Sequence, residues 1–114
     1  MKNIIFLLLI TSLLASCSAN KKSLYTWNKY EDSGYKYVKN NNEIATNGLI
    51  EEYKKIINSQ KGTRGMVPPG IYADYGFVLI QTNRVEEGKL MLQKEIELYP
   101  ESKIFIKKIY AMLE

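Results

Sequence analysis

The side chains that most enzymes use for proton transfer and nucleophilic attack are scarce in this sequence. Its 114 residues include no histidine, which removes the commonest general base and the commonest metal ligand. The serines therefore have no imidazole partner. The adjacent pairs Glu51–Glu52 and Glu86–Glu87 would point in different directions from a helix, and we expect them on solvated faces. We predict a protein without enzymatic activity, and we expect no metal, no cofactor and no small-molecule substrate.

Cys17 is the one residue for which the sequence indicates a specific modification. It is the only cysteine, so it can form no disulfide within the chain. It is preceded by Lys2, by a mostly apolar run over residues 4–14, and by the small residues Ala15 and Ser16. This is the layout of a secretory signal peptide, whose apolar core is too short to span a bilayer permanently. Cys17 therefore stands at the predicted end of an export signal.

The order Leu-Ala-Ser-Cys at residues 14–17 resembles the lipobox of bacterial lipoproteins. The resemblance implies cleavage before Cys17 and attachment of lipid to its sulfur. An ordinary signal peptide or a free thiol is the alternative, but a free thiol is a liability in an oxidising compartment. Ser18 stands where an aspartate would imply retention in the inner membrane. The resemblance therefore implies the periplasmic face of the outer membrane.

Cleavage would divide the chain into a signal peptide of residues 1–16, a lipidated tether of residues 17–23 and one small domain of residues 24–114. Loss of Lys2 lowers the formal net charge from +4 to +3, and the basic residues are scattered along the sequence. A nucleic-acid partner would need a clustered basic face. We therefore expect a membrane and an envelope protein as partners, and no nucleic acid.

The mature sequence is predicted to be all-α, because no run shows sustained alternation of period two. Leu49, Tyr53 and Ile56 recur on one face of a helix predicted for residues 43–60. A nearly continuous apolar run predicts a buried central helix over residues 71–82. We expect about two antiparallel helical hairpins and a C-terminal capping helix. The first expected helix lies within residues 24–40, where Trp27, Tyr30, Gly34 and Tyr37 have helical spacing. The others cover residues 43–60, 71–82, 84–99 and the end of the chain from Ser102.

Local signals mark several helix ends. Pro69 suits the first turn of a helix, where its missing N–H costs nothing. Pro100 ends the helix before it, and Ser102 is a predicted N-cap for the last helix. Glu95 and Glu97 are expected on the more exposed side of the helix that precedes Pro100.

Residues 69–100 match the register of a known helical motif at eight positions, namely Tyr72, Tyr75, Gly76, Leu79, Asn83, Gly88, Leu92 and Pro100. They resemble a tetratricopeptide repeat, a helix–turn–helix of about 34 residues. Small residues at positions 76 and 88 would let two helices approach closely, although each glycine costs about 1 kcal/mol against alanine. Two unrelated glycines in ordinary helices are the alternative. A fainter copy of the spacing comprises Tyr30, Gly34, Tyr37 and Asn41.

Glu95 departs from the motif, which prefers a small residue at that position. The departure implies either a looser packing of the next helix or a contact between Glu95 and a partner.

In tetratricopeptide repeats the inner face of the first helix often binds peptides. Carried over by register, that face consists of Ala73, Phe77, Ile80 and Gln81. It lacks the basic and asparagine side chains that clamp a terminal carboxylate. The resemblance therefore implies an apolar segment or helix as the ligand.

Nine tyrosines and one tryptophan are a high aromatic content for a chain of this size. Tyrosine and tryptophan are enriched in binding hot spots, but tyrosines also fill the cores of helical repeats. Most of the tyrosines lie at core spacings. Tyr25 and Trp27 precede the regular pattern, and we predict that these two contribute to a surface that binds a partner.

Three segments carry a further similarity: residues 24–30, residues 67–76 with Pro-Pro-Gly, and residues 94–102 with Tyr-Pro-Glu-Ser. Through them the chain resembles a family of small, uncharacterised bacterial outer-membrane lipoproteins with a tetratricopeptide-like domain. Asn28 stands where that family is expected to have a glycine, and Gly88 where an alanine is more usual. The resemblance implies a partner similar to the lipoproteins of the curli-secretion pore, whose genes tend to lie beside those of this family.

Together these features favour a membrane-anchored periplasmic lipoprotein that binds proteins or assembles an outer-membrane lipoprotein complex. Two alternatives are a structural envelope lipoprotein without a specific client and a small immunity or exclusion factor that blocks an external agent. Neither alternative requires enzymatic activity.

Overall fold

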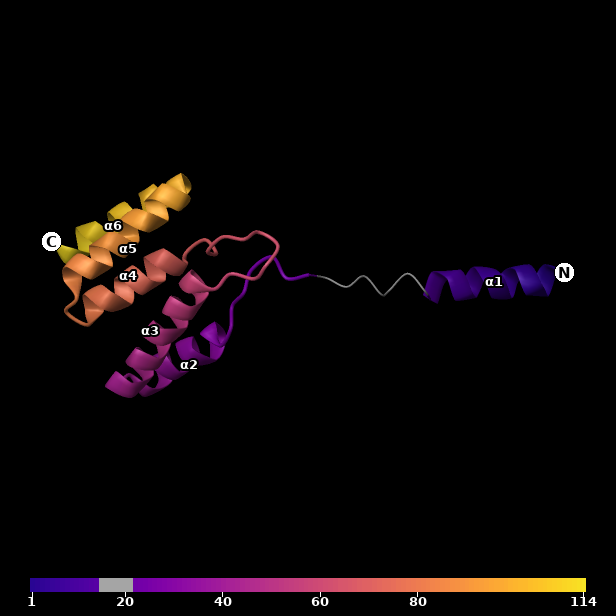
Figure 1. Cartoon of the computed structure of the whole chain (residues 1–114), viewed down its shortest axis with the longest axis horizontal. Coiled ribbons are helices and arrows are strands. Elements are labelled where there is room, and N and C mark those ends of the chain that lie inside the picture. Colours follow the sequence, from indigo (N-terminus) through magenta and orange to yellow (C-terminus); the bar gives the residue numbers. More distant parts are fainter. Residues whose placement is uncertain (15–21) are drawn as a thin grey trace.

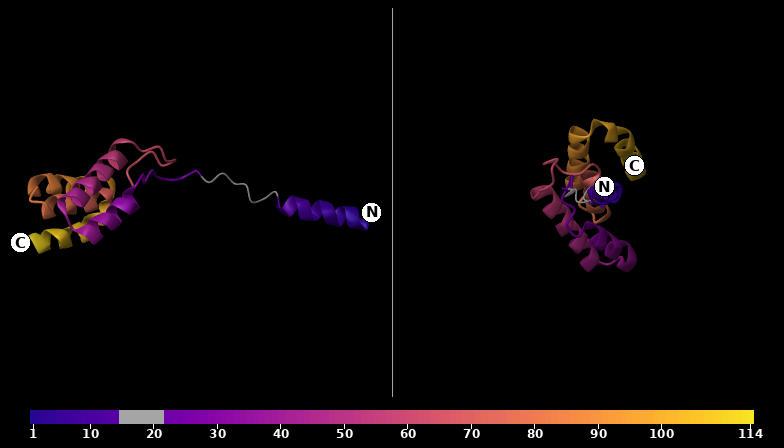
Figure 2. Two further views of the ribbon diagram at one scale, coloured as in Figure 1. Left: turned by 90° about the horizontal axis from the view of Figure 1, so that it is seen from below. Right: turned by 90° about the vertical axis from the view of Figure 1, so that its right-hand side faces the viewer.

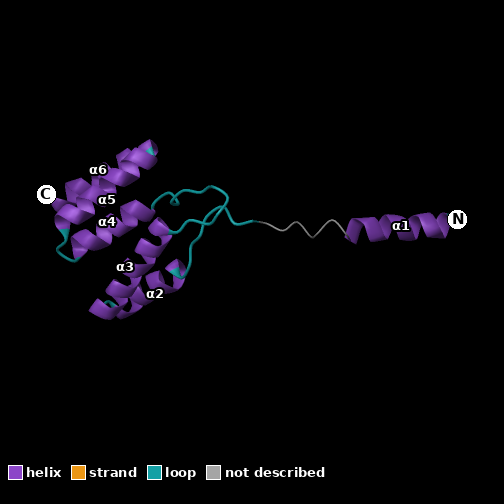
Figure 3. Ribbon diagram, viewed as in Figure 1, coloured by secondary structure: helices purple, strands orange, loops and turns teal. Residues whose placement is uncertain are grey.

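The computed structural model describes residues 1–14 and 22–114, and these residues are predominantly helical. Figure 3 shows helices and loops but no strand in this part of the chain. The all-α prediction is therefore confirmed. The elements are α1 (Lys2–Leu14), α2 (Tyr30–Asn40), α3 (Glu43–Asn58), α4 (Ile71–Gln81), α5 (Val85–Leu98), the short 3-10 helix η2 (Pro100–Ser102) and α6 (Lys103–Leu113).

Helix α1 contains the apolar run of the predicted signal peptide. Its first residues are exposed, including the apolar side chains of Ile4 and Phe6. Among the helices of the described ranges, none combines the length and the apolar character needed to cross a membrane. Cys17 and the predicted cleavage site lie outside the described residues, so lipidation stays a prediction.

The other helices form two hairpins and a C-terminal helix (Figures 1 and 2). Helix α2 pairs with α3, α4 pairs with α5, and the two hairpins meet where α3 packs on α4. Turn η2 then reverses the chain, and α6 returns along the second hairpin. This arrangement confirms the predicted hairpins with a closing C-terminal helix.

Helix α4 lies at the centre of the domain, between two clusters of buried side chains. The first cluster comprises Leu49, Ile50, Tyr53, Ile56, Val67, Ile71, Tyr75, Val78 and Leu79. The second comprises Ala73, Ile80, Leu92, Ile106 and Ile109. Because α4 supplies residues to both clusters, it is covered on most sides, which explains its almost uniformly apolar sequence.

Gly76 and Gly88 face each other where α4 crosses α5. A Cβ atom on Gly76 would lie 2.7 Å from the carbonyl oxygen of Gly88, and one on Gly88 would lie 2.5 Å from the carbonyl oxygen of Gly76. Both distances are shorter than non-bonded atoms tolerate, and the obstacle is backbone in each case. The predicted requirement for small residues at these positions is therefore a real packing requirement.

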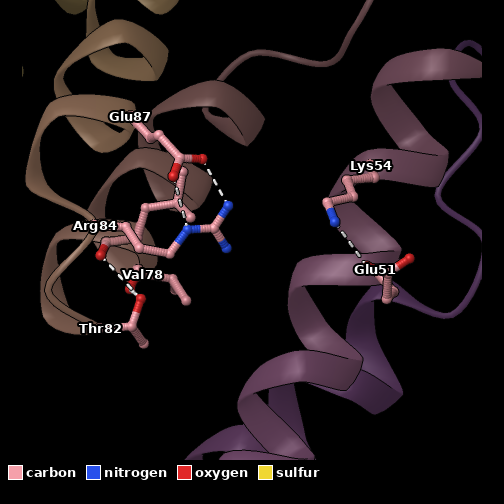
Figure 4. Close-up of polar contacts among 7 residues, drawn as sticks. Glu51, Lys54, Val78, Thr82, Arg84 and Glu87 are labelled. Atoms are coloured by element: carbon pink, nitrogen blue, oxygen red, sulfur yellow. Dashed lines mark hydrogen bonds and ion pairs between the residues drawn. The ribbon is translucent and has the colours of Figure 1, made fainter.

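The turn between α4 and α5 is closed by local polar contacts (Figure 4). The Thr82 hydroxyl donates to the carbonyl oxygen of Val78 at 3.1 Å. Asn83 adopts a left-handed conformation with φ 64°, which reverses the chain. The Arg84 guanidinium then donates to the Glu87 carboxylate at 2.6 Å and 3.0 Å. These contacts fix the angle at which α5 leaves the turn.

The fainter upstream copy is reproduced only in part. Asn41 ends α2 with φ 43°, as Asn83 does after α4, so the turn residue is equivalent in both hairpins. Tyr37 packs against the first core cluster. A Cβ atom on Gly34, however, would meet no atom of another segment within 4 Å, unlike one on Gly76. The close helix crossing is thus a property of the second hairpin.

The first helix of the domain begins later than predicted. Residues 24–29 are not helical, and α2 starts at Tyr30. Asn28 has φ 49°, a left-handed conformation that interrupts a helix, and Tyr30 N–H donates to the carbonyl oxygen of Trp27 in a turn. Position 28 is where the resembled family is expected to carry glycine, the residue that adopts this conformation most readily.

Pro69 lies just before α4 and not in its first turn, which corrects the prediction. Gly70, with φ 92°, separates Pro69 from the helix and serves as its N-cap residue. Ser102 does precede α6 as predicted. Its side chain makes no capping bond to α6, and its hydroxyl donates to Glu95 instead.

Glu52 is buried, contrary to the prediction of a solvated face for the pair Glu51–Glu52. Its carboxylate accepts hydrogen bonds from the Lys29 backbone N–H at 3.2 Å and the Lys55 ammonium at 2.7 Å. The Lys55 hydrogen bond holds the pKa of Glu52 below its usual range, against the opposing effect of burial. Neighbouring Glu51 is exposed and pairs with Lys54 (Figure 4).

Candidate functional site

The face of α4 predicted to bind a partner is mostly covered by the protein itself. Ala73 and Ile80 are buried in the second core cluster, and Phe77 is half-buried against it. Gln81 is exposed at the end of the helix. The covering side chains come from α5 and α6, including Leu92. A ligand on this face would therefore meet Phe77 and the edge of α6 instead of an open repeat groove.

A small apolar groove of about 190 Å³ lies between α4 and α6. It is lined by Ala73, Asp74, Phe77, Phe105, Lys108, Ile109 and Met112. Phe105 is 56% exposed and Met112 is 70% exposed, so apolar surface is available on the α6 side. The structure thus joins two of the predicted residues, Ala73 and Phe77, to residues of α6 for which the sequence predicted only a capping role.

A helical spacing could have revealed the contribution of α6. Phe105, Ile109 and Met112 follow one another at i, i+4 and i+7, beside the core positions Ile106 and Tyr110. The helix therefore has an apolar stripe broader than its packing onto α5 requires. Lys108 lies on the exposed side of that stripe.

Tyr25 and Trp27 lie at the start of a chain of aromatic rings that leads into the first core cluster. Ring centroids are 6.0 Å apart between Tyr25 and Trp27, and 5.8 Å apart between Trp27 and Tyr30. The chain continues through Tyr30 and Tyr53 at 5.7 Å to Tyr53 and Tyr75 at 5.4 Å. Trp27 is 43% exposed and Tyr25 is half-buried. The partly exposed rings of Tyr25 and Trp27 are thereby connected, through Tyr30, to the buried rings of Tyr53 and Tyr75 in the first core cluster.

Tyr30 and Asp74 connect the two hairpins by a hydrogen bond. The Tyr30 hydroxyl donates to the Asp74 carboxylate at 2.7 Å. Burial, followed by the Asp74 contact, raises the pKa of Tyr30 to about 12. Tyr30 therefore keeps its proton at neutral pH and acts as a hydrogen-bond donor, not as a base.

Hydrogen bonds hold the residues before α2 against the α3–α4 loop. The backbone N–H groups of Thr63 and Arg64 donate to the carbonyl oxygens of Ser23 at 3.0 Å and Leu24 at 3.1 Å. Gln60 binds the backbone of Thr26 in both directions, at 3.0 Å and 2.9 Å.

Gly62 leaves no room for a side chain beside Leu24 and Tyr25. The sequence does not predict this contact between residues 23–26 and the α3–α4 loop, because neither segment is helical and neither has a periodic pattern.

Glu95 is fully buried, which corrects the prediction that it lies on the more exposed side of α5. One carboxylate oxygen accepts from the Gly70 backbone N–H at 2.7 Å and from the Ser102 hydroxyl at 3.3 Å. The residue thus binds the N-terminal end of α4, where a negative charge is favourable. Its contacts are internal, so the departure from the repeat motif is explained within the chain.

Tyr99 adds a second contact between the same two segments. Its hydroxyl donates to the carbonyl oxygen of Val67 at 2.5 Å. Burial raises the pKa of Tyr99 to about 12, and the neighbouring Tyr25 adds to the effect. The Pro-Pro-Gly and Tyr-Pro-Glu-Ser segments are therefore joined by hydrogen bonds that position α4 against α5 and α6.

The described residues contain no group of three His, Cys, Asp or Glu side chains placed to hold a metal ion. A larger hollow of about 390 Å³ lies between α2 and α3. Its charged side chains include Lys36, Glu51 and Lys55, each of which is already in an ion pair. The groove between α4 and α6 has a more apolar lining than this hollow.

A comparison with known protein families gives a match, which lies over the helical part of the chain. A family model described as a domain of unknown function (DUF4810) matches residues 24–109. The chain belongs to this family. The match begins at Leu24, the second residue held by the α3–α4 loop, and ends at Ile109, the last buried residue of α6. No curated protein and no solved structure matches the chain.

Membership of the DUF4810 family agrees with the resemblance to an uncharacterised family that was inferred from the sequence. The three segments that carried it, residues 24–30, 67–76 and 94–102, all lie within the matched range. The family description assigns no function. Function must therefore be argued from the surfaces of the domain.

Proposed function

We propose that this protein is a lipid-anchored interaction module of the bacterial envelope, attached to the outer membrane through Cys17. Its partner is an envelope protein that docks on the groove between α4 and α6. The order Leu-Ala-Ser-Cys after an apolar helix supports the anchor. The exposed apolar surface of α6 beside Phe77 supports the docking site, and it is the observation that carries the proposal.

The groove favours an amphipathic helix as the docked element. Phe105 and Met112 offer an apolar stripe of the length of two helical turns, which suits side chains at i and i+7 of a partner helix. Lys107 and Lys108 are exposed on the same helix. A partner helix with acidic residues beside its apolar face would complement both features.

The resemblance to lipoproteins encoded beside the curli-secretion pore supports a particular class of partner. A lipoprotein similar to that pore would be anchored in the same membrane as this chain. Co-anchoring raises the effective concentration of each protein for the other, so even a small groove could sustain binding.

Site-specific crosslinking tests the docking site. A photoreactive amino acid replaces Phe105 in the full chain expressed in its own host, and a matched variant carries it at Val38. Val38 is a suitable control because it is 79% exposed and lies on α2, away from the groove. We expect an envelope protein to be crosslinked from position 105 and not from position 38. Equal crosslinking from both positions would contradict the docking site.

Replacement of Cys17 by serine tests the anchor separately. We expect the Cys17→Ser protein to remain uncleaved or to become soluble. A Cys17→Ser protein that is still processed and still fractionates with the outer membrane would overturn the lipid anchor, whatever the crosslinking result.

A further inference from the structure

Two segments form the end of the domain at which the tether enters, and together we call them the tether-end surface. They are residues 22–29 and residues 59–69 of the α3–α4 loop. The bonds from Thr63 and Arg64 to the backbone of residues 23–24 hold them side by side. Figure 1 shows these two segments at one end of the helical domain and the α2–α3 turn at the other.

The tether-end surface is basic, although basic residues are scattered along the sequence as a whole. It contains Lys22, Lys29, Lys61 and Arg64 and no aspartate or glutamate. All four side chains are exposed. Three carboxylates border this surface beside Lys29. Glu52 is paired with Lys55 and Asp32 with Lys36, and Glu31 shares a hollow with Lys29, so the basic pair farther along the surface is Lys61 and Arg64. Folding therefore brings together two pairs of positive charges that lie more than thirty residues apart in the sequence.

Exposed apolar side chains lie among these charges. Leu24 is 54% exposed and Trp27 is 43% exposed, with the Tyr25 ring packed edge-on against Trp27. Tryptophan and tyrosine flanked by lysine and arginine are the side chains that proteins place at the level of lipid headgroups. The hydrogen bonds of Thr26 with Gln60 keep this segment from swinging away from the domain.

We propose that the tether-end surface rests on an anionic phospholipid bilayer, with Leu24 and Trp27 among the headgroups. Lys61 and Arg64 then face lipid phosphates. This inference rests on the proposed lipid anchor at Cys17, because six residues from Cys17 to Ser23 reach at most about 20 Å. With so short a tether, this end of the domain is the end nearest to the bilayer.

Trp27 itself reports on the proposed contact, because it is the only tryptophan in the chain. The processed lipoprotein is reconstituted into vesicles of phosphatidylglycerol and phosphatidylethanolamine with brominated acyl chains, which quench tryptophan nearby. A control moves the probe to the far end of the domain, as Trp27→Phe with Ile44→Trp. Ile44 is 84% exposed at the start of α3, so the substitution disturbs no core contact.

We expect at least about twofold stronger quenching of Trp27 than of the probe at position 44. Lys61→Glu with Arg64→Glu should reduce the quenching of Trp27 toward that of the control, while circular dichroism confirms an unchanged fold. Equal quenching at positions 27 and 44, or quenching unaffected by the charge reversal, would overturn the bilayer contact. Flotation of the vesicles reports the lipid anchor independently, so failure of the anchor is distinguished from failure of the contact.

Discussion

Glu95 joins three parts of the domain through one buried carboxylate. Its side chain extends from α5 and accepts hydrogen bonds from the Gly70 backbone N–H, at the start of α4, and from the Ser102 hydroxyl, just before α6. The second carboxylate oxygen has no hydrogen-bond partner among the described residues. A buried acidic group is costly unless hydrogen bonds and helix ends compensate it. Glu95 therefore specifies how these helices meet, and two donors inside the protein depend on its carboxylate.

Replacing Glu95 by alanine should destabilise the domain by about 3 kcal/mol, because Gly70 N–H and Ser102 lose their acceptor inside the protein. Glu97 on the same helix is exposed and supplies the matched control, Glu97→Ala, which should change stability by less than about 0.5 kcal/mol. Urea unfolding followed by circular dichroism measures both. A Glu95→Ala protein as stable as the control would show that the carboxylate is dispensable.

Glu52 should make stability depend on pH in the acid range. Its pKa in the folded protein lies below the ordinary value of 4.5, so its contribution is present above that value and is lost as the pH falls through the folded pKa. We expect Glu52→Gln to lower stability at pH 7, and the difference from wild type to shrink between about pH 5 and pH 3. Glu51→Gln, in an exposed pair with Lys54, should differ little from wild type at either pH.

The burial of Glu52 and Glu95 could not be predicted from helical periodicity. Spacing on α3 correctly places Leu49, Tyr53 and Ile56 inside, but Glu52 lies next to that face and is covered by the segment that carries Lys29. Glu95 is covered because η2 and the Pro-Pro-Gly segment converge on it. In both cases part of the cover comes from a non-helical segment distant in sequence, the residues before α2 for Glu52 and the Pro-Pro-Gly segment for Glu95, and a helical pattern holds no information about it.

At the scale of the elements, the crossing of α4 and α5 determines the second hairpin. Gly76→Ala and Gly88→Ala should each destabilise the domain by more than about 2 kcal/mol, despite the helix propensity of alanine, because a methyl group would meet the facing carbonyl oxygen. Gly34→Ala and Gly48→Ala are controls in helices where the added carbon meets no other segment within 4 Å. These two should stabilise by up to about 1 kcal/mol in thermal unfolding. A tolerated Gly76→Ala would refute the close crossing.

The order of the helices, the burial of α4 and the close crossing at its glycine could all be predicted from the sequence, because each follows from the residue pattern of one helix or of two consecutive helices. The start of α2 could not, since the helical spacing from Trp27 to Tyr37 continues through a residue that leaves the helical region. Asn28 interrupts the helix by its left-handed conformation, which asparagine tolerates and a spacing argument ignores. The sequence predicts the α4 side of the groove through Ala73 and Phe77, but not the α6 side, for which it predicts only a capping role.

At the scale of the whole molecule, two contacts join the hairpins: an aromatic contact between α3 and α4, and a hydrogen bond between α2 and α4. The rings of Tyr53 and Tyr75 stack at 5.4 Å, and the Tyr30 hydroxyl binds Asp74 above them. This interface connects the segment near the tether to the helix that lines the docking groove. The proposed membrane surface and the proposed partner groove therefore belong to one packed body.

The attachment of residues 23–27 to the α3–α4 loop decides how the domain is held relative to its anchor. Gln60→Ala removes both side-chain bonds to Thr26 and should loosen this segment. We expect hydrogen exchange of the Thr63 and Arg64 amides to accelerate at least about tenfold, since their acceptors lie on the same segment.

Amides at the α4–α5 crossing, such as Gly88, should exchange at the wild-type rate, because no bond of Gln60 reaches them. Uniformly faster exchange would instead mean that Gln60 supports the whole fold. If only the segment loosens, the anchored domain gains freedom to tilt, and the quenching of Trp27 by brominated lipid should fall with it. That joint loss would tie the orientation of the domain to a loop contact rather than to the length of the tether.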